Sequence, residues 1–144
     1  MKKQALRIFT MLSLVLMLTA VSVHAQSKRT TINIPFNFTV GQTTLPAGEY
    51  TIEPNRKDSP DVWLIQSTSG HDSVLFTTGS TWASETPKRT GLVFNNYDGQ
   101  YFLAKIWNAG DNSGRALRKP RLERQLAKNG AQREVVVVTP GSGL

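Results

Sequence analysis

The stretch that decides the fold is TINIPFNFTV, residues 31–40, in which apolar and polar residues alternate. A period of two places the apolar side chains on one face of a strand, whereas a helix would scatter them around its axis. The stretch therefore predicts a strand with one buried face. Because Pro35 cannot donate a ladder hydrogen bond, we expect this strand to lie at a sheet edge or to contain a bulge.

Further strands are predicted downstream, each separated from the next by turn residues. Residues 45–48, LPAG, suit a turn, and Tyr50 and Ile52 then resume the alternation, so we expect a hairpin with the first strand. The polar residues 55–60 precede a second predicted hairpin, formed by residues 62–65 and 73–78.

A third hairpin is predicted around Asp98 and Gly99, with two possible registers. A two-residue turn pairs Phe94 with Leu103 and leaves both faces mixed. A three-residue loop with a bulge at Gly99 pairs Phe94 with Phe102, and we prefer it because one face becomes wholly apolar. That face holds Leu92, Phe94, Phe102, Ala104 and Ile106. The opposite face presents Tyr101, Leu103 and Trp107, which predict a contact with another element, a partner or a ligand, with cover from within the chain favoured.

The C-terminal part predicts one short helix and a last strand. Residues 121–128 favour a helix that starts after Pro120, ends at Gly130 and docks through Leu122 and Leu126. Residues 134–139 contain four consecutive valines, which predict a strand buried on both faces or sealed against a neighbour. Residues 140–144 are expected to form a frayed tail.

The first 25 residues have the pattern of a secretory signal peptide. Lys2, Lys3 and Arg7 form a positive region, residues 8–21 are uncharged, and small residues up to Ala25 predict cleavage there. The uncharged run is short for a membrane span. We therefore expect an exported protein, periplasmic or extracellular, with no stable membrane span after cleavage and with a single β-rich domain over residues 26–144.

Length and composition bound the fold and the chemistry. The chain has 144 residues, which fits one domain. It has no cysteine, so the domain has no disulfides and must be stabilised by its apolar core. We predict an all-β fold, a small antiparallel sandwich or flattened barrel of about seven strands with one short C-terminal helix.

The search for catalytic residues is mostly negative. His71 is the only histidine after the predicted cleavage site, so one subunit cannot build a multi-histidine metal site. His71, Asp72 and Ser73 are contiguous, and neighbours on a strand point to opposite faces, which argues against a triad. Asp58 with Asp61, or Glu49 with Glu53, could supply two catalytic carboxylates, but no feature of the sequence near either pair indicates a pocket. We predict no catalytic residue, no metal site and no cofactor.

The strongest electrostatic feature is a basic stretch between residues 115 and 128. Its members are Arg115, Arg118, Lys119, Arg121, Arg124 and Lys128. We favour a solvated face, and the alternative is contact with an anionic glycan or with another envelope protein. An exported chain without a nucleic-acid-binding motif is not expected to bind nucleic acid.

Several segments together resemble a family of small exported bacterial proteins of unassigned function, acidobacterial in type. The resemblance covers FNFTVG at 36–41 with LPAGEYTI at 45–52, LVF at 92–94 with YFL at 101–103 through Trp107, and ERQLA at 123–127. Pro120 and Gln125 depart from the serine and the acid expected there, which puts the helix capping in doubt. The resemblance implies export and a β fold, and it implies no catalytic residue or ligand.

Three functions follow as hypotheses. The first is a non-enzymatic envelope or extracellular binding or structural module that acts through a β face or edge. The alternative is a barrel that binds an apolar small molecule, in a pocket lined by Phe36, Phe38, Phe94 and Phe102. The third and least favoured is a carboxylate-dependent glycan hydrolase.

Overall fold

The structure is a computed structural model, and it describes residues 30–55 and 59–139. The predicted signal peptide and the predicted frayed tail lie outside the described residues. These described residues form ten strands and one helix: β1 Thr30–Ile34, β2 Phe38–Val40, β3 Thr43–Leu45, β4 Gly48–Pro54, β5 Val62–Ser67, β6 Ser73–Trp82, β7 Gly91–Tyr97, β8 Gln100–Trp107, β9 Ser113–Leu117, α2 Arg121–Asn129 and β10 Arg133–Val138. The all-β prediction is confirmed, but the strand count is ten rather than about seven.

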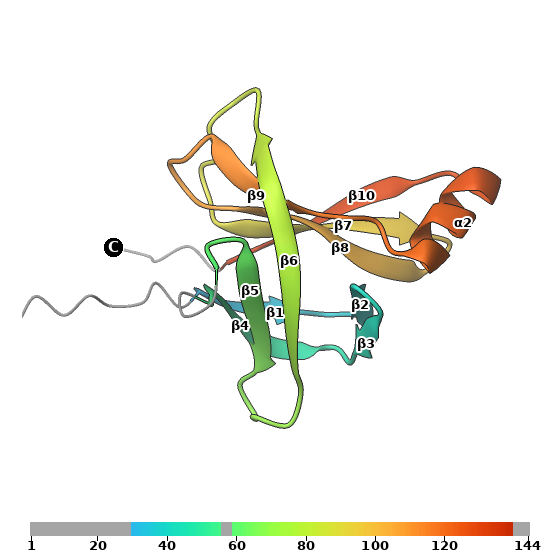
Figure 1. Cartoon of the computed structure of the whole chain (residues 1–144), viewed down its shortest axis with the longest axis horizontal. Helices are drawn as coiled ribbons and strands as arrows, with labels where there is room; N and C mark the ends of the chain where they lie inside the picture. The colour runs from blue at the N-terminus through green and yellow to red at the C-terminus, as the bar shows by residue number, and fades with distance from the viewer. Residues whose placement is uncertain (1–29, 56–58, 140–144) are drawn as a thin grey trace, which may run out of the picture.

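The strands form one sheet that folds over into two layers (Figure 1). The long strand β6 links the layers, because residues 73–77 pair with β5 and residues 78–82 pair with β9. One layer contains β1, β4 and β5, and the other contains β7, β8, β9 and β10. Among the described strands no ladder joins β1 to β10, so the sheet is not closed. The fold is therefore sandwich-like rather than a barrel.

The decisive stretch 31–40 forms two strands, not one. β1 ends before Pro35 and pairs with β4, whereas β2 pairs antiparallel with β3 and parallel with β8 in the other layer. Pro35 offers no ladder N–H, so the chain leaves one layer there and enters the other. The predicted hairpin with residues 50–52 is wrong, because β2 and β3 lie between the two strands in the chain. The strands nevertheless pair antiparallel, with Ile32 opposite Tyr50.

The preferred register of the third hairpin is wrong. Asp98 and Gly99 both have positive φ, 52° and 86°, and form the two-residue turn that joins Tyr97 to Gln100. Phe94 therefore lies opposite Leu103. An irregularity between Val93 and Phe94 shifts the register by one residue, so that Leu92 lies opposite Ile106.

This register is stable because both faces of the hairpin are covered. On one face Leu92, Phe94, Leu103 and Ile106 join the main core. On the other face Val93, Asn95, Tyr97 and Phe102 are also buried. Apolar side chains on either face of the hairpin are therefore shielded from water. The three-residue loop was preferred because it gathers them on one face, and this advantage disappears when both faces are covered.

Two predictions about the C-terminal part are also wrong. α2 does not dock through both leucines, because Leu122 is 51% exposed and Leu126 is only half-buried, whereas Glu123 is 1% exposed. The valine strand β10 is not buried on both faces, because Val136 and Val138 are 58% and 41% exposed. β10 pairs with β7 on one side, so the expectation that this strand is paired is confirmed.

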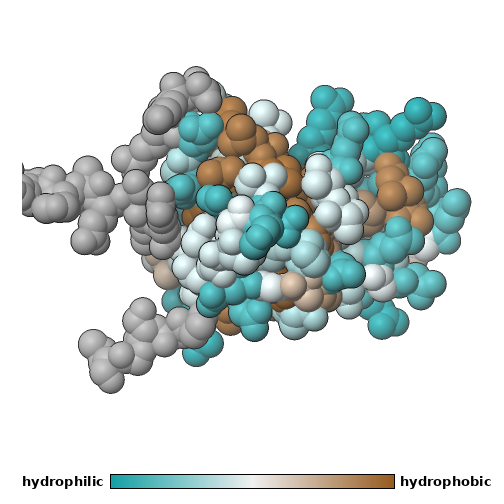
Figure 2. Space-filling view, turned by 90° about the horizontal axis from the view of Figure 1, so that it is seen from below, coloured by the Kyte–Doolittle hydropathy of each residue, from teal (hydrophilic) through white to brown (hydrophobic). Residues whose placement is uncertain are grey.

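The space-filling view gives the surface character of one side of the molecule. Figure 2 shows hydrophobic residues in the middle of this side, between hydrophilic ones, and mainly hydrophilic residues at the helix end. In the described ranges, no helix is long and apolar enough to cross a membrane.

Candidate functional site

The predicted basic stretch does not form one patch. Arg115, on β9, donates from Nη1 to Oδ1 of Asp61 at 2.8 Å. Lys119 donates from Nζ to the hydroxyl of Tyr97 at 3.0 Å and to Oε1 of Gln132 at 2.8 Å. The remaining members are exposed side chains on or next to α2: Arg118, Arg121, Arg124 and Lys128. The structure thus divides the stretch into two paired residues and a solvent-facing group.

The three predicted outer-face residues are covered by the chain itself. Tyr101 stacks on Phe36, with ring centroids 3.9 Å apart, and Leu103 is a core residue that is 3% exposed. Trp107 lies so close to Gly114 that a Cβ atom there would come within 2.3 Å of the indole ring. Placing Leu103 on the outer face is therefore wrong. The favoured interpretation, cover from within the chain, accounts for all three residues.

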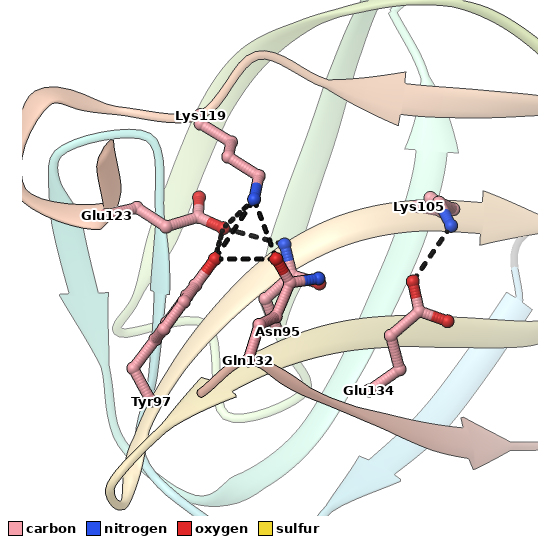
Figure 3. A network of polar contacts seen from close by, with 7 residues as sticks. All are labelled: Asn95, Tyr97, Lys105, Lys119, Glu123, Gln132 and Glu134. Atoms are coloured by element: carbon pink, nitrogen blue, oxygen red, sulfur yellow. Dashed lines mark hydrogen bonds and ion pairs between the residues drawn. The ribbon is translucent and has the colours of Figure 1, made fainter. Parts of the chain in front are cut away.

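A buried polar network joins α2 to the sheet (Figure 3). Oε1 of Glu123 accepts a hydrogen bond from Nδ2 of Asn95 at 2.6 Å and lies 3.3 Å from the Tyr97 hydroxyl. Nζ of Lys119 lies 3.9 Å from the same carboxylate. Gln132 completes the network by donating from Nε2 to Oδ1 of Asn95 at 2.8 Å. Each buried polar group has a partner, which suits a docking contact rather than a reactive site.

Sequence reasoning missed this network. Glu123 was not among the predicted site residues. One signal was available: Asn95 stands inside an apolar strand, and a buried amide requires a polar partner.

The aromatic residues proposed to line a pocket instead fill the core. Phe94 contacts Phe36 and Phe38 edge to face, with centroids 5.1 and 5.4 Å apart, and Phe38 contacts Tyr50 in the same way at 5.2 Å. Phe102 lies on the other face of the sheet, 6.0 Å from Tyr97. The predicted location of the apolar pocket is therefore wrong.

A pocket of about 360 Å³ is formed where β1, β5, β7 and β9 begin and where β4 and β8 end. In Figure 1 the first residues of β7 and the last of β8 lie at the opposite end of the sandwich from α2. We call it the end pocket. Its apolar lining residues are Ile32, Ile52, Pro54, Pro60, Trp63, Leu92 and Ile106, and its polar ones include Thr30, Thr90, Asn108, Asp111, Ser113 and Arg115. Binding sites for small molecules have this size and this mainly apolar lining.

A second hollow lies beside α2 and is more polar. Its volume is about 480 Å³, and it is lined by the β2–β3 turn, Phe102 and the first turn of the helix. Thr39, Gln42, Thr44, Arg121 and Gln125 contribute polar groups to it. The end pocket is therefore the better candidate for an apolar ligand, although it is the smaller of the two.

The end pocket was not predicted, because its walls come from six strands spread over the chain. Of the predicted site residues, only Arg115 reaches its rim. Of the described acids weighed for catalysis, Asp61 pairs with Arg115, and Glu49 and Glu53 lie on β4 outside the lining. Asp58, the fourth of these acids, lies outside the described residues. Within the described residues, no three His, Cys, Asp or Glu side chains gather to hold a metal ion.

Comparison of the chain with protein-family models, with curated proteins and with solved structures found no match. The site is therefore interpreted from its geometry alone.

Proposed function

We propose that this protein is an exported, non-enzymatic binding module that holds a largely apolar small molecule in the end pocket. The observation that supports this proposal is the pocket itself, about 360 Å³ between two sheet layers and lined by core residues. Ile32, Ile52, Leu92 and Ile106 are each no more than 3% exposed, so its walls belong to the most ordered part of the fold. A preformed apolar wall lowers the ordering cost of binding.

The residues that line the end pocket suit a carrier better than a glycan hydrolase. Small-molecule carriers need a shaped apolar cavity, whereas hydrolysis of a glycan needs two carboxyl groups across a cleft, roughly 5 to 10 Å apart. In the end pocket Asp111 is the one acid among the described lining residues. Export is inferred from residues 1–25, as is a site of action in the periplasm or outside the cell.

Binding of an apolar fluorescent probe tests the proposal. N-phenyl-1-naphthylamine is expected to increase its emission with the purified protein and to saturate at one site. Ile52→Phe adds volume to the pocket wall and should weaken binding at least about tenfold, because an overfilled wall leaves less room for the probe. Leu75→Phe is the matched control, since Leu75 is 58% exposed and lies outside the pocket. Equal binding by both variants would contradict the proposal.

The free side of β10 supports a second candidate function, a structural module that adds a strand from an envelope partner. Thr139 donates to the Thr90 carbonyl, so by antiparallel alternation the backbone groups of Val136 and Val138 point away from β7. Strand addition uses such edges. Val136→Lys should abolish crosslinking to a partner in envelope extracts and leave probe binding unchanged. Retained crosslinking would exclude this role for β10.

A further inference from the structure

The hollow beside α2, with a volume of about 480 Å³, is separate from the end pocket, because the two share no lining residue. We call it the helix hollow. The turn between β2 and β3 and the start of α2 contribute most of its lining, and in Figure 1 these three elements lie at the same end of the molecule. Its volume is in the range of small-molecule sites.

Several hydrogen-bonding side chains of the helix hollow are available to a ligand. Among the described residues, the guanidinium of Arg121 and the amides of Gln42 and Gln125 have no hydrogen bond or ion pair. The hydroxyls of Thr39 and Thr44 lie 3.2 Å apart and bond to each other, and each can make a further bond. Amides and hydroxyls both donate and accept, as sugar hydroxyls do. The lining therefore suits a ligand with several hydroxyl groups.

The charge at the helix hollow is positive. Arg121 is the one ionisable side chain among its described lining residues. Nearby, Lys119 and Glu123 offset each other in the buried network, with Nζ 3.9 Å from the carboxylate. The cations that stay exposed on or beside the helix are Arg118, Arg121, Arg124 and Lys128. Such a surface attracts anions, and the planar guanidinium of Arg121 can hold a carboxylate through two parallel hydrogen bonds.

The helix hollow also has an apolar side, formed by Phe102, Pro120 and Leu122. Leu122 is 51% exposed, and the packing of α2 on the sheet does not cover it. A ligand surface made of C–H groups would remove this side chain from water, which is favourable. One face of a sugar ring is such a surface, and its hydroxyls project from the edge toward neighbouring polar groups.

These observations together define a class of ligand. We propose that the helix hollow binds an acidic sugar, a uronic acid unit of an anionic polysaccharide. Its carboxylate pairs with Arg121, its hydroxyls bond to the amides of Gln42 and Gln125, and its ring lies against Leu122. A compact anion would leave the amides and the apolar side unused, and a neutral sugar would leave Arg121 without a counter-charge. The inference goes beyond the proposed function, because it concerns another site and another class of ligand.

Four probes separate the contribution of the charge from that of the sugar. Trigalacturonate and trimannuronate have both features, the methyl ester of trigalacturonate lacks the charge, and tricarballylate has three carboxylates without a sugar ring. In calorimetric titrations at neutral pH and about 0.15 M salt, where charges more than about 8 Å apart are largely screened, one uronate should bind at least about tenfold more tightly than the ester and tricarballylate.

Each other outcome of these titrations overturns a stated part of the inference. Equally tight binding of the ester would overturn the role of the carboxylate. Equally tight binding of tricarballylate would overturn the role of the sugar. If neither uronate binds, the whole inference is wrong.

Arg121→Gln locates the binding in the helix hollow. The variant should bind the preferred uronate about tenfold more weakly and the methyl ester within about twofold of the wild type, because only the charged ligand loses a partner. Arg124→Gln is the matched control, since it removes the same charge from an exposed position of α2 outside the lining. Equal weakening by the two variants would indicate attraction to the whole basic surface and overturn the site.

Gln42→Ala combined with Gln125→Ala tests the hydrogen bonds to the sugar. Both residues are exposed, so the fold should be retained, which circular dichroism verifies. The double variant should bind the uronate and the ester about fivefold more weakly, because both ligands keep their hydroxyls. Unchanged binding of both would overturn the role of the amides.

N-phenyl-1-naphthylamine distinguishes this inference from the proposed function. Its binding should be the same in the wild type, in Arg121→Gln and in the presence of saturating uronate, because the two sites share no residue. Competition between the uronate and this probe would overturn the separate site. Uronate binding without probe binding would support the inference and contradict the proposed function alone.

Discussion

The two ends of the sandwich differ in how the space between the layers is filled. At the helix end, Phe94 contacts Phe36 and Phe38 edge to face and Tyr101 stacks on Phe36, so aromatic rings pack between the layers. At the other end, aliphatic residues, prolines and Gly91 face each other across a pocket of about 360 Å³. We call these the closed end and the open end.

The difference shows that the same alternation of apolar residues can build either a sealed core or a binding cavity. Side-chain volume decides between them, because an aromatic ring spans the gap between two layers that an isoleucine leaves partly empty. We therefore expect the closed end to contribute more to stability than the open end, where the pocket leaves room for a ligand. The predictions below test this division.

The largest effect is expected from one substitution made at both ends. Ile34→Ala at the closed end should lower the free energy of unfolding by about 4 kcal/mol, because Ile34 is 0% exposed and its cavity is sealed. Ile106→Ala at the open end should cost nearer 2 kcal/mol, since Ile106 already borders an open pocket. Urea denaturation of both variants measures the difference. Equal losses would show that the two ends do not differ in packing.

The next effect concerns the polar network that covers the closed end. Glu123→Ala should cost about 2 kcal/mol, because the amide of Asn95 loses its buried acceptor. Glu123→Gln retains one acceptor oxygen and should cost less. Arg124→Ala, at the next position on α2 and exposed, is the control and should change stability by less than about 0.5 kcal/mol. If Glu123→Ala and Arg124→Ala have equal thermal midpoints, the network does not hold the helix.

The sequence predicted the strands better than it predicted what lies between them. The β-favouring runs 62–65 and 73–78 located β5 and β6 correctly. Alternation in residues 31–40 located β structure but not its division into β1 and β2, because burial on one face is a local property of the chain whereas the change of layer is not. The register of the hairpin at Asp98 and Gly99 was missed, because the irregularity between Val93 and Phe94 follows from packing on both faces. The choice between the registers needed knowledge of what covers the second face.

Sequence patterns did not predict most of the candidate site. Helix periodicity pointed to Leu122 as the docking residue, yet the sheet face under α2 presents Asn95 and Tyr97, so a carboxylate is the better partner. The end pocket depends on the relative position of six strands. Arg115 was singled out for its charge, and its place at the pocket rim follows from the pairing of β6 with β9 rather than from any motif.

A smaller effect is expected from the titration of Tyr50 in the closed end. Burial, followed by the nearby Asp72 carboxylate, raises the pKa of Tyr50 above its ordinary value of about 10. Above pH about 10 the unfolded chain releases this proton while the folded chain keeps it, so the free energy of unfolding falls until the folded pKa is passed. Below pH about 10 the contribution is complete and does not vary.

Tyr50→Phe isolates this contribution. The variant loses the hydrogen bond from the Tyr50 hydroxyl to the Pro46 carbonyl, 2.7 Å, and should be about 1 kcal/mol less stable at neutral pH. Its stability should then decline less steeply above pH about 10 than that of the wild type. Lysines titrate in the same range, so the difference between the two urea-denaturation curves is the measured quantity. Parallel curves would show that Tyr50 does not contribute to the alkaline loss.

The smallest effect is expected where the basic side chains are exposed. Arg118, Arg121 and Arg124 face solvent on or beside α2. Replacing all three by Gln should therefore leave the free energy of unfolding within about 1 kcal/mol of the wild type, because exposed charges contribute little. Arg115→Gln together with Lys119→Gln is the matched comparison, since both of these residues have partners at 3.0 Å or less. If the triple variant loses cooperative unfolding while the paired variant does not, the exposed residues are structural and the division of the basic stretch is wrong.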